Sequence, residues 1–517
     1  MKYPIGIQNF EKIRTEGYVY VDKTALMYKM VSEGSYYFLS RPRRFGKSLL
    51  VSTLEAYFEG KCHLFDGLAI SEKETEWLQY PILHLDLNTR EYKDGDSLRA
   101  ELHKHLEAWE KQYGDEFCKR ALEERFVHII ELAYAKTGRP VVVLVDEYDK
   151  PLLQAIGNDK LQAEYRSTLK AFYGALKSCD KYIKFAFLTG VTKFGKVSVF
   201  SDLNNLIDLS MLPQYTTICG VSEEELHHNF DDSISALANA NAITIEECYK
   251  KLRTDFDGYH FDVDSPGMYN PFSLLNTLSF QVFRDYWFET GTPSFLVRQL
   301  QKTDYPLDMM TEEELTADTL NSIDMMDDNP LPLLYQSGYL TIKGYDKEFA
   351  TYKLDFPNRE VREGFIKYLL PFYTPKNREK PLVFIRNFVN DIRIGNPDGF
   401  MQRMQALFAR GDYQVMGDKE IYFQNAMYVI FMMLGFYVDV ERHTSNGRMD
   451  ITIQTDIFIY ILELKINQSA DIALQQIENR GYAQSFVGDQ RNIYLIGVNF
   501  STETKQIDDW KVKKGLE

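Results

Sequence analysis

A short pattern of charged residues near the C-terminal end could bind a metal ion beside a phosphodiester. Glu463 and Lys465 stand two residues apart, the flanking positions 457–464 are otherwise apolar, and Asp450 lies in the strand-like run before them. Side chains alternate between the two faces of a strand, so Glu463 and Lys465 would point the same way. The apolar flanks predict a central, buried strand, where charged side chains are costly unless they are paired or bind metal.

This spacing is typical of a metal-dependent nuclease. A hairpin would bring Asp450 beside Glu463, and the two carboxylates could hold Mg²⁺, with Mn²⁺ as an alternative, next to the scissile phosphate. Lys465 would orient the attacking water or stabilise the charge on the phosphate. Glu420, just before an apolar helix, could add a carboxylate ligand, and Gln476 on the following helix could position water or phosphate. The other interpretation is an internal Glu–Lys ion pair that closes a strand.

A second pattern, near the N-terminal end, is typical of a phosphate-binding loop. The segment 41–48 (RPRRFGKS) follows a strand candidate and opens a helical stretch, where main-chain N–H groups attract phosphate oxygens. Lys47 would reach the β- and γ-phosphates of a nucleotide, and the Ser48 hydroxyl would bind Mg²⁺. Arg41 stands where the pattern GxxxxGK[ST] has its first glycine, so we expect an unusual loop with added positive charge. The residues expected to contact the nucleotide here are Arg43, Arg44, Gly46, Lys47 and Ser48.

Two further strand ends could complete that site. The run 141–145 ends in Asp146 and Glu147, and carboxylates at the C-terminal end of a buried strand lie where α/β sheets bind ligands. Asp146 would hold Mg²⁺ through water, and Glu147 would polarise the attacking water. Thr189, at the end of another strand, could contact the γ-phosphate. The alternatives are a solvated acidic turn and an ordinary turn threonine.

The elements that would position these residues alternate along the first part of the chain. Apolar runs without polar alternation, separated by amphipathic stretches, predict a parallel sheet covered by helices on both faces, an α/β architecture. The expected strands are 36–39, 81–87, 141–145 and 185–189, and the clearest helices are 97–111 and 161–178.

The remainder of the chain suggests two more regions. Ser222 followed by Glu225 predicts a capped helix start, and helical patterns continue to about residue 373. The run 333–342 predicts a helix that turns into a strand, as in winged-helix modules. Residues 371–381 predict a linker. A further α/β unit follows, with helices at 400–410, 421–435 and 470–483 and strands near Val438, Asp450, Phe458 and Ile493. The predicted domains are 1–220 (P-loop NTPase), 221–375 (mainly helical, winged-helix-like) and 376–517 (restriction-endonuclease-like).

The bulk properties narrow the choice of function. The 517 residues carry a formal net charge of −16, so a protein that coats DNA non-specifically is excluded and any nucleic-acid contact must be a local patch. The five cysteines form no CxxC pair, which favours a reducing compartment without disulfides or a zinc site. The N-terminal residues lack an apolar signal segment, and the longest apolar run is too short for a membrane span. We therefore expect a cytoplasmic protein that does not contact membranes, and the sequence leaves room for an oligomer.

Several segments together resemble a known family. RPRRFGKSL at 41–49, VDEYDKP at 145–151 and TGVTKFGKVSVFSDLNNL at 189–206 are similar to the predicted AAA-ATPase-like family, which is abundant in anaerobic bacteria. YNPFSLL at 269–275 and the YWF and TGTP segments between 286 and 293 match it as well. The tail, with SNGRMDI, ILELK and ALQQIENRGYA, resembles the associated PD-(D/E)XK nuclease domain.

The resemblance implies ATP and Mg²⁺ at the first site, with Lys47, Ser48, Asp146 and Glu147 in the nucleotide roles. It implies nuclease roles for Asp450, Glu463 and Lys465, with Gln476 in the trailing helix and Glu420 as the least certain acid. The expected partner is nucleic acid, DNA rather than RNA.

The sequence is compatible with three functions. The first is an ATP-dependent nuclease acting in defence or on mobile elements. The second is a nucleotide-dependent regulatory switch whose nuclease-like domain binds nucleic acid or a partner without cleaving it. The third is a motor or loader that moves along DNA, which the absence of an obvious basic channel in the sequence disfavours.

Overall fold

The chain forms two compact units in the computed structural model. The first unit is Met1–Gln299 with Thr311–Arg362, and the second is Leu300–Met310 with Glu363–Glu517. The structure describes residues 1–517 except 115–118, 195–199, 201–202, 204, 290–295, 298, 301–302, 322, 324–328, 374–380, 409–418, 446–447, 502, 505 and 516–517. At 289, 381–382, 384, 419–420, 422–423, 441–445 and 448–450 only the backbone is described. The division into three domains stays a prediction.

The first unit is built on a five-stranded parallel sheet in the order β2-β3-β4-β1-β5. Its strands are β1 (Tyr36–Ser40), β2 (Ile82–Asp86), β3 (Val141–Asp146), β4 (Ile183–Gly190) and β5 (Ile207–Asp208). The four apolar runs expected to be strands are confirmed as β1 to β4. Strands β1 and β3 are buried on both faces and β4 nearly so, as expected for a parallel sheet covered by helices. The order places β4 between β1 and β3, so the ends of these three strands lie side by side at one edge.

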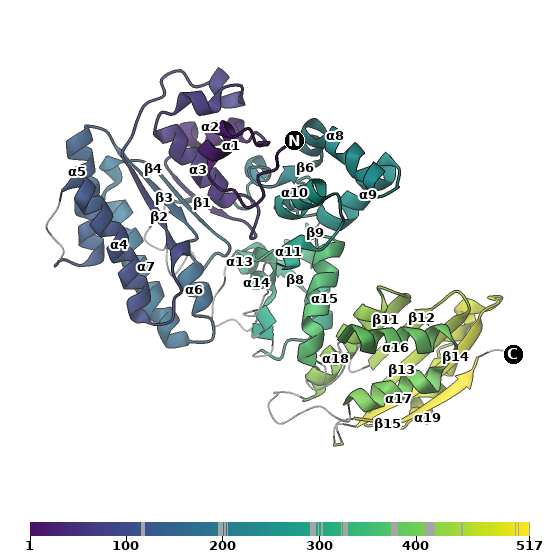
Figure 1. Ribbon diagram of the computed structural model, residues 1–517. Coiled ribbons are helices and arrows are strands. Elements are labelled where there is room, and N and C mark those ends of the chain that lie inside the picture. Colours follow the sequence, from purple (N-terminus) through teal and green to yellow (C-terminus); the bar gives the residue numbers. More distant parts are fainter. Residues whose placement is uncertain are drawn as a thin grey trace. The chain divides into compact units, whose positions relative to one another are not determined.

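Helices cover both faces of this sheet, as expected for the α/β class. Figure 1 shows α4, α5 and α7 on one side and α1, α2 and α3 on the other. The bounds are α1 (Phe10–Thr15), α2 (Thr24–Glu33), α3 (Lys47–Phe58), α4 (Gly95–Tyr113), α5 (Leu122–Thr137), α6 (Lys150–Gln154) and α7 (Asp159–Ser178). Since α3 follows β1 directly and α6 follows β3, the loops at both strand ends are short.

A small helical cluster follows the sheet within the first unit. It comprises α8 (Glu223–Ala240), α9 (Ile245–Phe256) and α10 (Pro271–Phe280), whose apolar faces share one buried core. The capping box at the start of α8 is confirmed: Ser222 accepts from the main-chain N–H of Glu225, and the Glu225 carboxylate accepts from that of Ser222. The short strands β6 (Val221–Ser222) and β7 (Met268–Tyr269) pair beside it.

The predicted helix-to-strand transition is also confirmed. Residues 333–342 lie in α14 and the start of β9, and β9 pairs with β10 as a hairpin in the sheet β8-β10-β9. The elements of this part are α11 (Tyr286–Glu289), β8 (Glu314–Thr316), α13 (Ala317–Leu320), α14 (Leu331–Gln336), β9 (Thr341–Asp346) and β10 (Thr351–Asp355). Helix α15 (Arg359–Tyr373) begins in the first unit and ends in the second.

The second unit is a five-stranded mixed sheet with helices. The strand order is β11-β12-β13-β14-β15, with β13 and β14 parallel and the other pairs antiparallel. The elements are α16 (Pro381–Arg393), α17 (Pro397–Phe408), α18 (Lys419–Leu434), β11 (Asp439–Ser445), β12 (Arg448–Gln454), β13 (Phe458–Ile466), α19 (Ala470–Asn479), β14 (Asn492–Ser501) and β15 (Gln506–Lys514). The expected central position of the strand that carries Glu463 and Lys465 is confirmed, because β13 is third of five.

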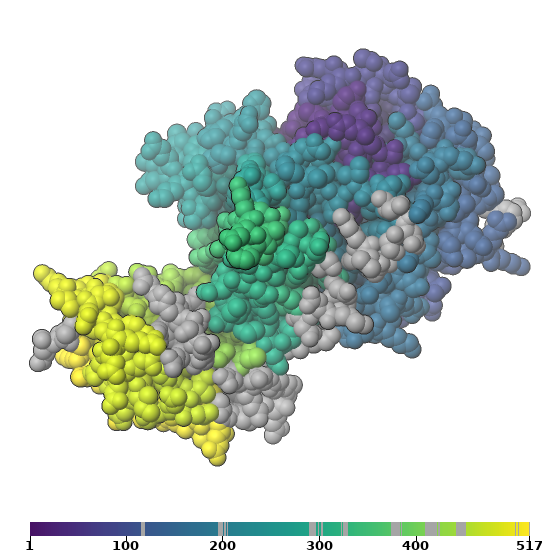
Figure 2. Space-filling model, turned by 180° about the vertical axis from the view of Figure 1, so that it is seen from behind, coloured from purple at the N-terminus to yellow at the C-terminus, as the bar shows by residue number. Residues whose placement is uncertain are grey.

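Two features of the second unit differ from expectation. The linker expected at 371–381 is wrong at both ends, because α15 continues through Pro371 to Tyr373 and α16 begins at Pro381. Residues 374–380 lie outside the described part. Strand β15 was not expected, because it is an edge strand with mostly polar side chains. The C-terminal residues, yellow in Figure 2, lie at the surface of their unit. None of the helices in the described part is long and apolar enough to span a membrane.

Candidate functional sites

The loop between β1 and α3 has the backbone shape of an anion-binding turn. Arg44 and Gly46 both have positive φ, 68° and 96°, and α3 begins directly afterwards at Lys47. No side chain caps this helix start, and the first N–H groups of a helix have no partner within it. A phosphate group is the partner that such a terminus attracts.

The four residues predicted to hold the nucleotide phosphates and Mg²⁺ lie together at this point. Lys47 is 4% exposed, and its Nζ donates to the main-chain oxygens of Arg41 (3.1 Å) and Pro42 (3.3 Å). The same Nζ lies 3.7 Å from Oε1 of Glu147. The Ser48 side chain lies close enough to the carboxylate of Asp146 to lower its pKa. One buried ammonium, one hydroxyl and two carboxylates therefore converge from two segments that lie far apart in the sequence.

The electrostatics of Asp146 suit a ligand of a divalent cation. Burial and, to a smaller extent, the adjacent Glu147 charge raise the pKa of Asp146 to about 6, although Ser48 and Lys47 act in the opposite direction. A nearby divalent cation would favour the ionised form of such a carboxylate. Hydroxyl and carboxylate oxygens are the protein ligands that Mg²⁺ prefers, so Ser48 and Asp146 fit this ion.

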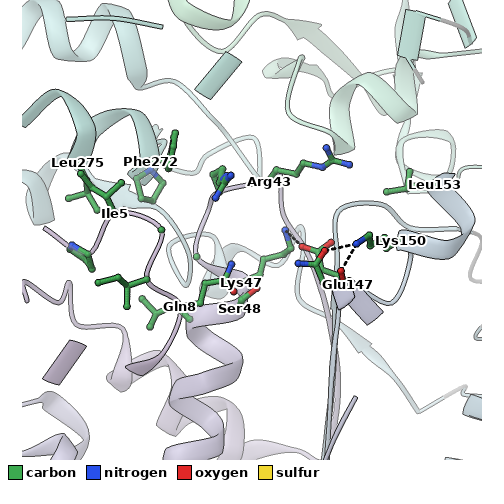
Figure 3. A pocket seen from close by; sticks show the side chains of 18 of the residues that line it. Ile5, Gln8, Arg43, Lys47, Ser48, Glu147, Lys150, Leu153, Phe272 and Leu275 are labelled. Carbon is green, nitrogen blue, oxygen red and sulfur yellow. Dashed lines mark hydrogen bonds and ion pairs between the residues drawn. The ribbon is translucent and has the colours of Figure 1, made fainter. Parts of the chain in front are cut away.

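A pocket of about 500 Å³ opens in front of the loop. Figure 3 shows Glu147 and Lys150 on one side, Ile5, Phe272 and Leu275 on the other, and Lys47 and Ser48 between them. One end of the pocket is therefore charged and the other largely apolar, as expected for a ligand with a phosphate chain and an aromatic base. The lining includes the expected contacts Arg43, Arg44, Gly46, Lys47, Ser48 and Glu147.

Three residues singled out by the sequence lie outside the pocket lining, namely Arg41, Asp146 and Thr189. Asp146, at the end of β3, is only 6% exposed. Arg41, expected to add charge to the loop, is 1% exposed and donates to the main-chain oxygens of Ser40, Ser210 and Tyr215. Its guanidinium also stacks over Phe261, so it supports the loop from behind. Thr189 is fully buried, and within the described part its hydroxyl has no hydrogen-bond partner. Its proposed contact with the γ-phosphate stays a prediction.

Sequence reasoning missed a buried carboxylate that ties two strand ends together. Asp149 accepts from the main-chain N–H groups of Val191 and Thr192 and from the Thr192 hydroxyl. A Cβ at Gly190 would lie 2.4 Å from Asp149 Oδ1, so glycine is needed there. Asp149 lies within the VDEYDKP segment, which was the available signal. Its contacts fix the end of β4 against the loop that carries Glu147.

A second missed contact holds the phosphate loop from the helical side. The indole Nε1 of Trp287 donates to the main-chain oxygen of Arg43 (3.1 Å), and its main-chain N–H donates to Glu360 (2.8 Å). The guanidinium of Arg44 lies over the Phe272 ring, 4.8 Å from its centre. Residues more than 200 positions away therefore set the shape of the loop, and no local motif reveals such contacts.

The candidate nuclease residues lie on neighbouring central strands. The β12–β13 register places Asp450 directly opposite Glu463, as the hairpin argument predicted. Glu463 is fully buried and Lys465 is 4% exposed, and Lys465 Nζ donates to Glu463 Oε1 at 2.5 Å. The two side chains therefore lie on one face and form a direct ion pair. The side chains of Asp450 and Glu420 lie outside the described part, so only their backbone positions on β12 and α18 are given.

Helix α19 packs on the face of the sheet that carries Glu463. Ile459, Ile461 and Ile477 share one buried cluster, and Gly497, opposite Glu463 in β14, has no room for a Cβ because Ala470 O would lie 2.2 Å away. Gln476 on this helix has a buried side-chain nitrogen without a hydrogen-bond partner in the described part. Among the described side chains no group of three or more carboxylate, His or Cys ligands occurs, and that set excludes Asp450 and Glu420.

Comparison with known proteins also assigns the two candidate sites to two different domains. Residues 4–200 match the sequence model of the predicted AAA-ATPase family, and residues 418–510 match that of the PD-(D/E)XK nuclease superfamily. A protein of Azotobacter chroococcum mcd 1, described as an uncharacterized protein in the vnfD 5' region, is 34% identical over 519 residues, 98% of each chain. The chain therefore belongs to the predicted AAA-ATPase-like proteins that carry a C-terminal PD-(D/E)XK nuclease superfamily domain.

Proposed function

We propose that the first unit binds and hydrolyses ATP with Mg²⁺, and that the C-terminal domain is a metal-dependent nuclease for nucleic acid, DNA rather than RNA. The observation that carries the proposal is the convergence of Lys47, Ser48 and Glu147 at the charged end of one pocket, with the buried carboxylate of Asp146 next to Ser48. The pocket volume falls in the range of small-molecule sites, roughly 300–1,000 Å³. Its apolar end suits a nucleobase.

Each residue at the first site has a role that its position supports. Bound Mg²⁺ supplies positive charge to the phosphate chain, and Ser48 and Asp146 would hold it. Lys47 would leave the main-chain oxygens of Arg41 and Pro42 for phosphate oxygens, a stronger charge-assisted contact. Glu147, half-buried beside it, would accept the proton of the attacking water.

At the second site, Glu463 and Lys465 form a buried ion pair, and a metal ion would have to bind beside them for catalysis. Asp450 and Glu463 face one another across β12 and β13, where their carboxylates would bind the metal ion that polarises the phosphodiester. Lys465 would then stabilise the negative charge that develops on the phosphate.

The proposal is tested by two assays on the full chain. ATP hydrolysis should require Mg²⁺ and should be lost in Lys47→Ala, with the exposed Lys160→Ala as the matched control. Nucleic-acid cleavage should require Mg²⁺ or Mn²⁺ and should be lost in Glu463→Gln, with the exposed Glu478→Gln as the control. Equal cleavage by wild type and Glu463→Gln would remove the assigned nuclease site, and equal hydrolysis by wild type and Lys47→Ala would remove the assigned ATPase site.

A second candidate function is a nucleotide-dependent switch whose nuclease-like domain binds nucleic acid without cleaving it. The observation that favours it is the direct contact between Lys465 and Glu463, which neutralises both charges within the chain. In this case, wild type would bind nucleic acid with ATP-dependent affinity, and no metal ion would produce cleavage. The four free cysteines among the described residues are consistent with a cytoplasmic location for either function.

A further inference from the structure

Lys150 places a second lysine ammonium at the charged end of the pocket. It lies at the start of α6, three residues after Glu147, and lines the pocket together with Lys47 and Arg43. Figure 3 shows its side chain beside Glu147, across the pocket from Phe272 and Leu275.

The ammonium of Lys150 is held only by neutral oxygens. Its Nζ donates to the main-chain oxygen of Asn88 at 2.5 Å and to Asn88 Oδ1 at 2.9 Å. Among the ion pairs of the described residues none includes Lys150. The two nearest carboxylates in the sequence have other partners: Glu147 pairs with Lys47, and Asp149 accepts from Val191 and Thr192. Neutral oxygens orient the ammonium without forming an ion pair with it.

Charges of both signs surround the Lys150 ammonium. Burial lowers the pKa of Lys150, the carboxylates of Glu147, Asp86 and Glu101 raise it, and the Arg43 guanidinium lowers it. Three cationic side chains in one pocket repel one another, and a bound anion removes that cost. A nucleoside triphosphate is an anion of suitable charge.

The sheet order indicates which phosphate Lys150 would meet. Lys47 belongs to the β1 end and the start of α3, whose N–H groups would surround the phosphates nearer the nucleoside. Lys150 belongs to the β3 end, which is separated from β1 by β4 and which carries Glu147. Because Glu147 is the residue proposed to act on the water that attacks the terminal phosphate, a cation three residues later lies on the γ-phosphate side.

We propose that Lys150 binds the γ-phosphate and so makes the pocket select nucleoside triphosphate over diphosphate. This inference rests on the proposed ATP site. The Asn88 oxygens hold the ammonium in place before the nucleotide binds, and phosphate oxygens then replace them. When the γ-phosphate leaves, Lys150 returns to Asn88, and the link between the β2 end and α6 is restored.

The test compares triphosphate and diphosphate affinity in the full chain. Equilibrium dialysis with Mg²⁺ would measure binding of the β,γ-imido analogue of ATP and of ADP to wild type, Lys150→Gln and Lys150→Arg, with the exposed Lys160→Gln as control. Loss of one charge-assisted hydrogen bond should weaken triphosphate binding by Lys150→Gln about tenfold, with ADP binding within about twofold of wild type. Lys150→Arg should keep most of the triphosphate preference, and Lys160→Gln should match wild type.

The possible results separate this inference from the proposed function. Equal weakening of both nucleotides by Lys150→Gln would show that Lys150 only supports the fold between Asn88 and α6, and would overturn the inference while leaving the ATP site intact. Unchanged affinity for both nucleotides would overturn it as well. If wild type binds neither nucleotide, the proposed ATPase function itself fails and this inference fails with it.

Discussion

The two candidate sites hold buried charge in opposite ways. At the first site, Lys47 and Glu147 come from segments about 100 residues apart along the sequence, lie 3.7 Å from one another and border an open pocket. At the second site, Glu463 and Lys465 are two residues apart on one strand and form a buried ion pair at 2.5 Å. The first arrangement leaves its charges available to a ligand, whereas the second has already neutralised them.

The two sites therefore depend on their surrounding residues to different degrees. Lys47 has main-chain partners that no side-chain substitution removes, so the fold of the first unit should tolerate the loss of its carboxylate partner Glu147. Lys465 depends on Glu463, because removing one partner of a buried ion pair lowers the free energy of unfolding by about 3–5 kcal/mol. Stability and activity should therefore be separable at the first site and linked at the second.

The largest effect on stability is expected at the second site. Lys465→Met removes the ammonium next to a fully buried carboxylate, and we expect the second unit to lose about 3–5 kcal/mol of unfolding free energy. Hydrogen exchange of the β13 amides in the full chain would measure it. The matched control is Lys513→Met, because Lys513 also pairs with a glutamate, Glu478, but at an exposed position where such pairs contribute about 0–1 kcal/mol.

A double substitution tests whether the loss comes from the unpaired carboxylate. Glu463→Gln combined with Lys465→Met removes both charges, so the pair should be less destabilised than Lys465→Met alone. An equal loss in the single and double variants would show that the two side chains do not depend on one another, and the contrast between the two sites would disappear.

The next effect concerns Asp149, a fully buried carboxylate close to the first site. Asp149→Ala would leave the N–H groups of Val191 and Thr192 and the Thr192 hydroxyl without their acceptor, at a cost of about 2–4 kcal/mol. Thermal unfolding of the full chain by calorimetry would report it as a lower Tm of the first unit. Asp149→Asn keeps one oxygen acceptor and should lose less, whereas an unchanged Tm in Asp149→Ala would contradict the assigned anchoring role.

The first unit also holds a buried acid that is neutral near pH 7. Glu360 is 1% exposed, and burial raises its pKa to about 8 from an ordinary value of 4.5, despite the hydrogen bond from the main-chain N–H of Trp287. The folded chain keeps a proton there that the unfolded chain releases above pH 4.5. This contribution to stability is complete below pH 4.5 and is lost as pH rises to 8, on the order of 1 kcal/mol per pH unit.

Calorimetry between pH 6.5 and 8 tests this contribution. The wild-type Tm should fall across this range, and Glu360→Gln, whose amide is neutral at every pH, should flatten the fall. The range starts above pH 6 because the raised pKa of Asp146, about 6, acts in the same direction at lower pH. The exposed turn residue Glu348 provides the control, since Glu348→Gln should leave the slope unchanged. A slope that Glu360→Gln does not alter would place the titrating group elsewhere.

The sequence predicted those parts of the fold that depend on local patterns. Strands β1 to β4 follow from apolar runs between amphipathic helices, and the start of α8 follows from the Ser222–Glu225 capping box. The facing of Asp450 and Glu463 follows from hairpin length and strand alternation. Each inference needs only neighbouring residues and one rule of backbone geometry.

Most features that the sequence did not predict depend on contacts between distant segments, and one depends on a weak strand pattern. Arg41 turns away from the pocket because oxygens of Ser210 and Tyr215, about 170 positions later, accept its donors. The apolar end of the pocket combines Ile5 with Phe272, and no local pattern joins two segments so far apart. Strand β15 is an exposed edge whose polar residues obscure the alternation that identifies a strand.

The smallest effect on stability is expected at Glu147, where the contrast between the two sites can be tested most directly. Glu147→Gln removes a carboxylate that lies 3.7 Å from Lys47, but Lys47 keeps its bonds to Arg41 and Pro42, so unfolding should change by less than about 1 kcal/mol. ATP hydrolysis should nevertheless fall about 100-fold, the usual loss when a general base is removed, while ATP binding stays within about twofold. Calorimetry, hydrolysis and dialysis on the same preparation measure the three quantities. A stability loss as large as that of Lys465→Met would mean that Lys47 depends on its carboxylate partner, as Lys465 does, and both sites would then hold their charge in the same way.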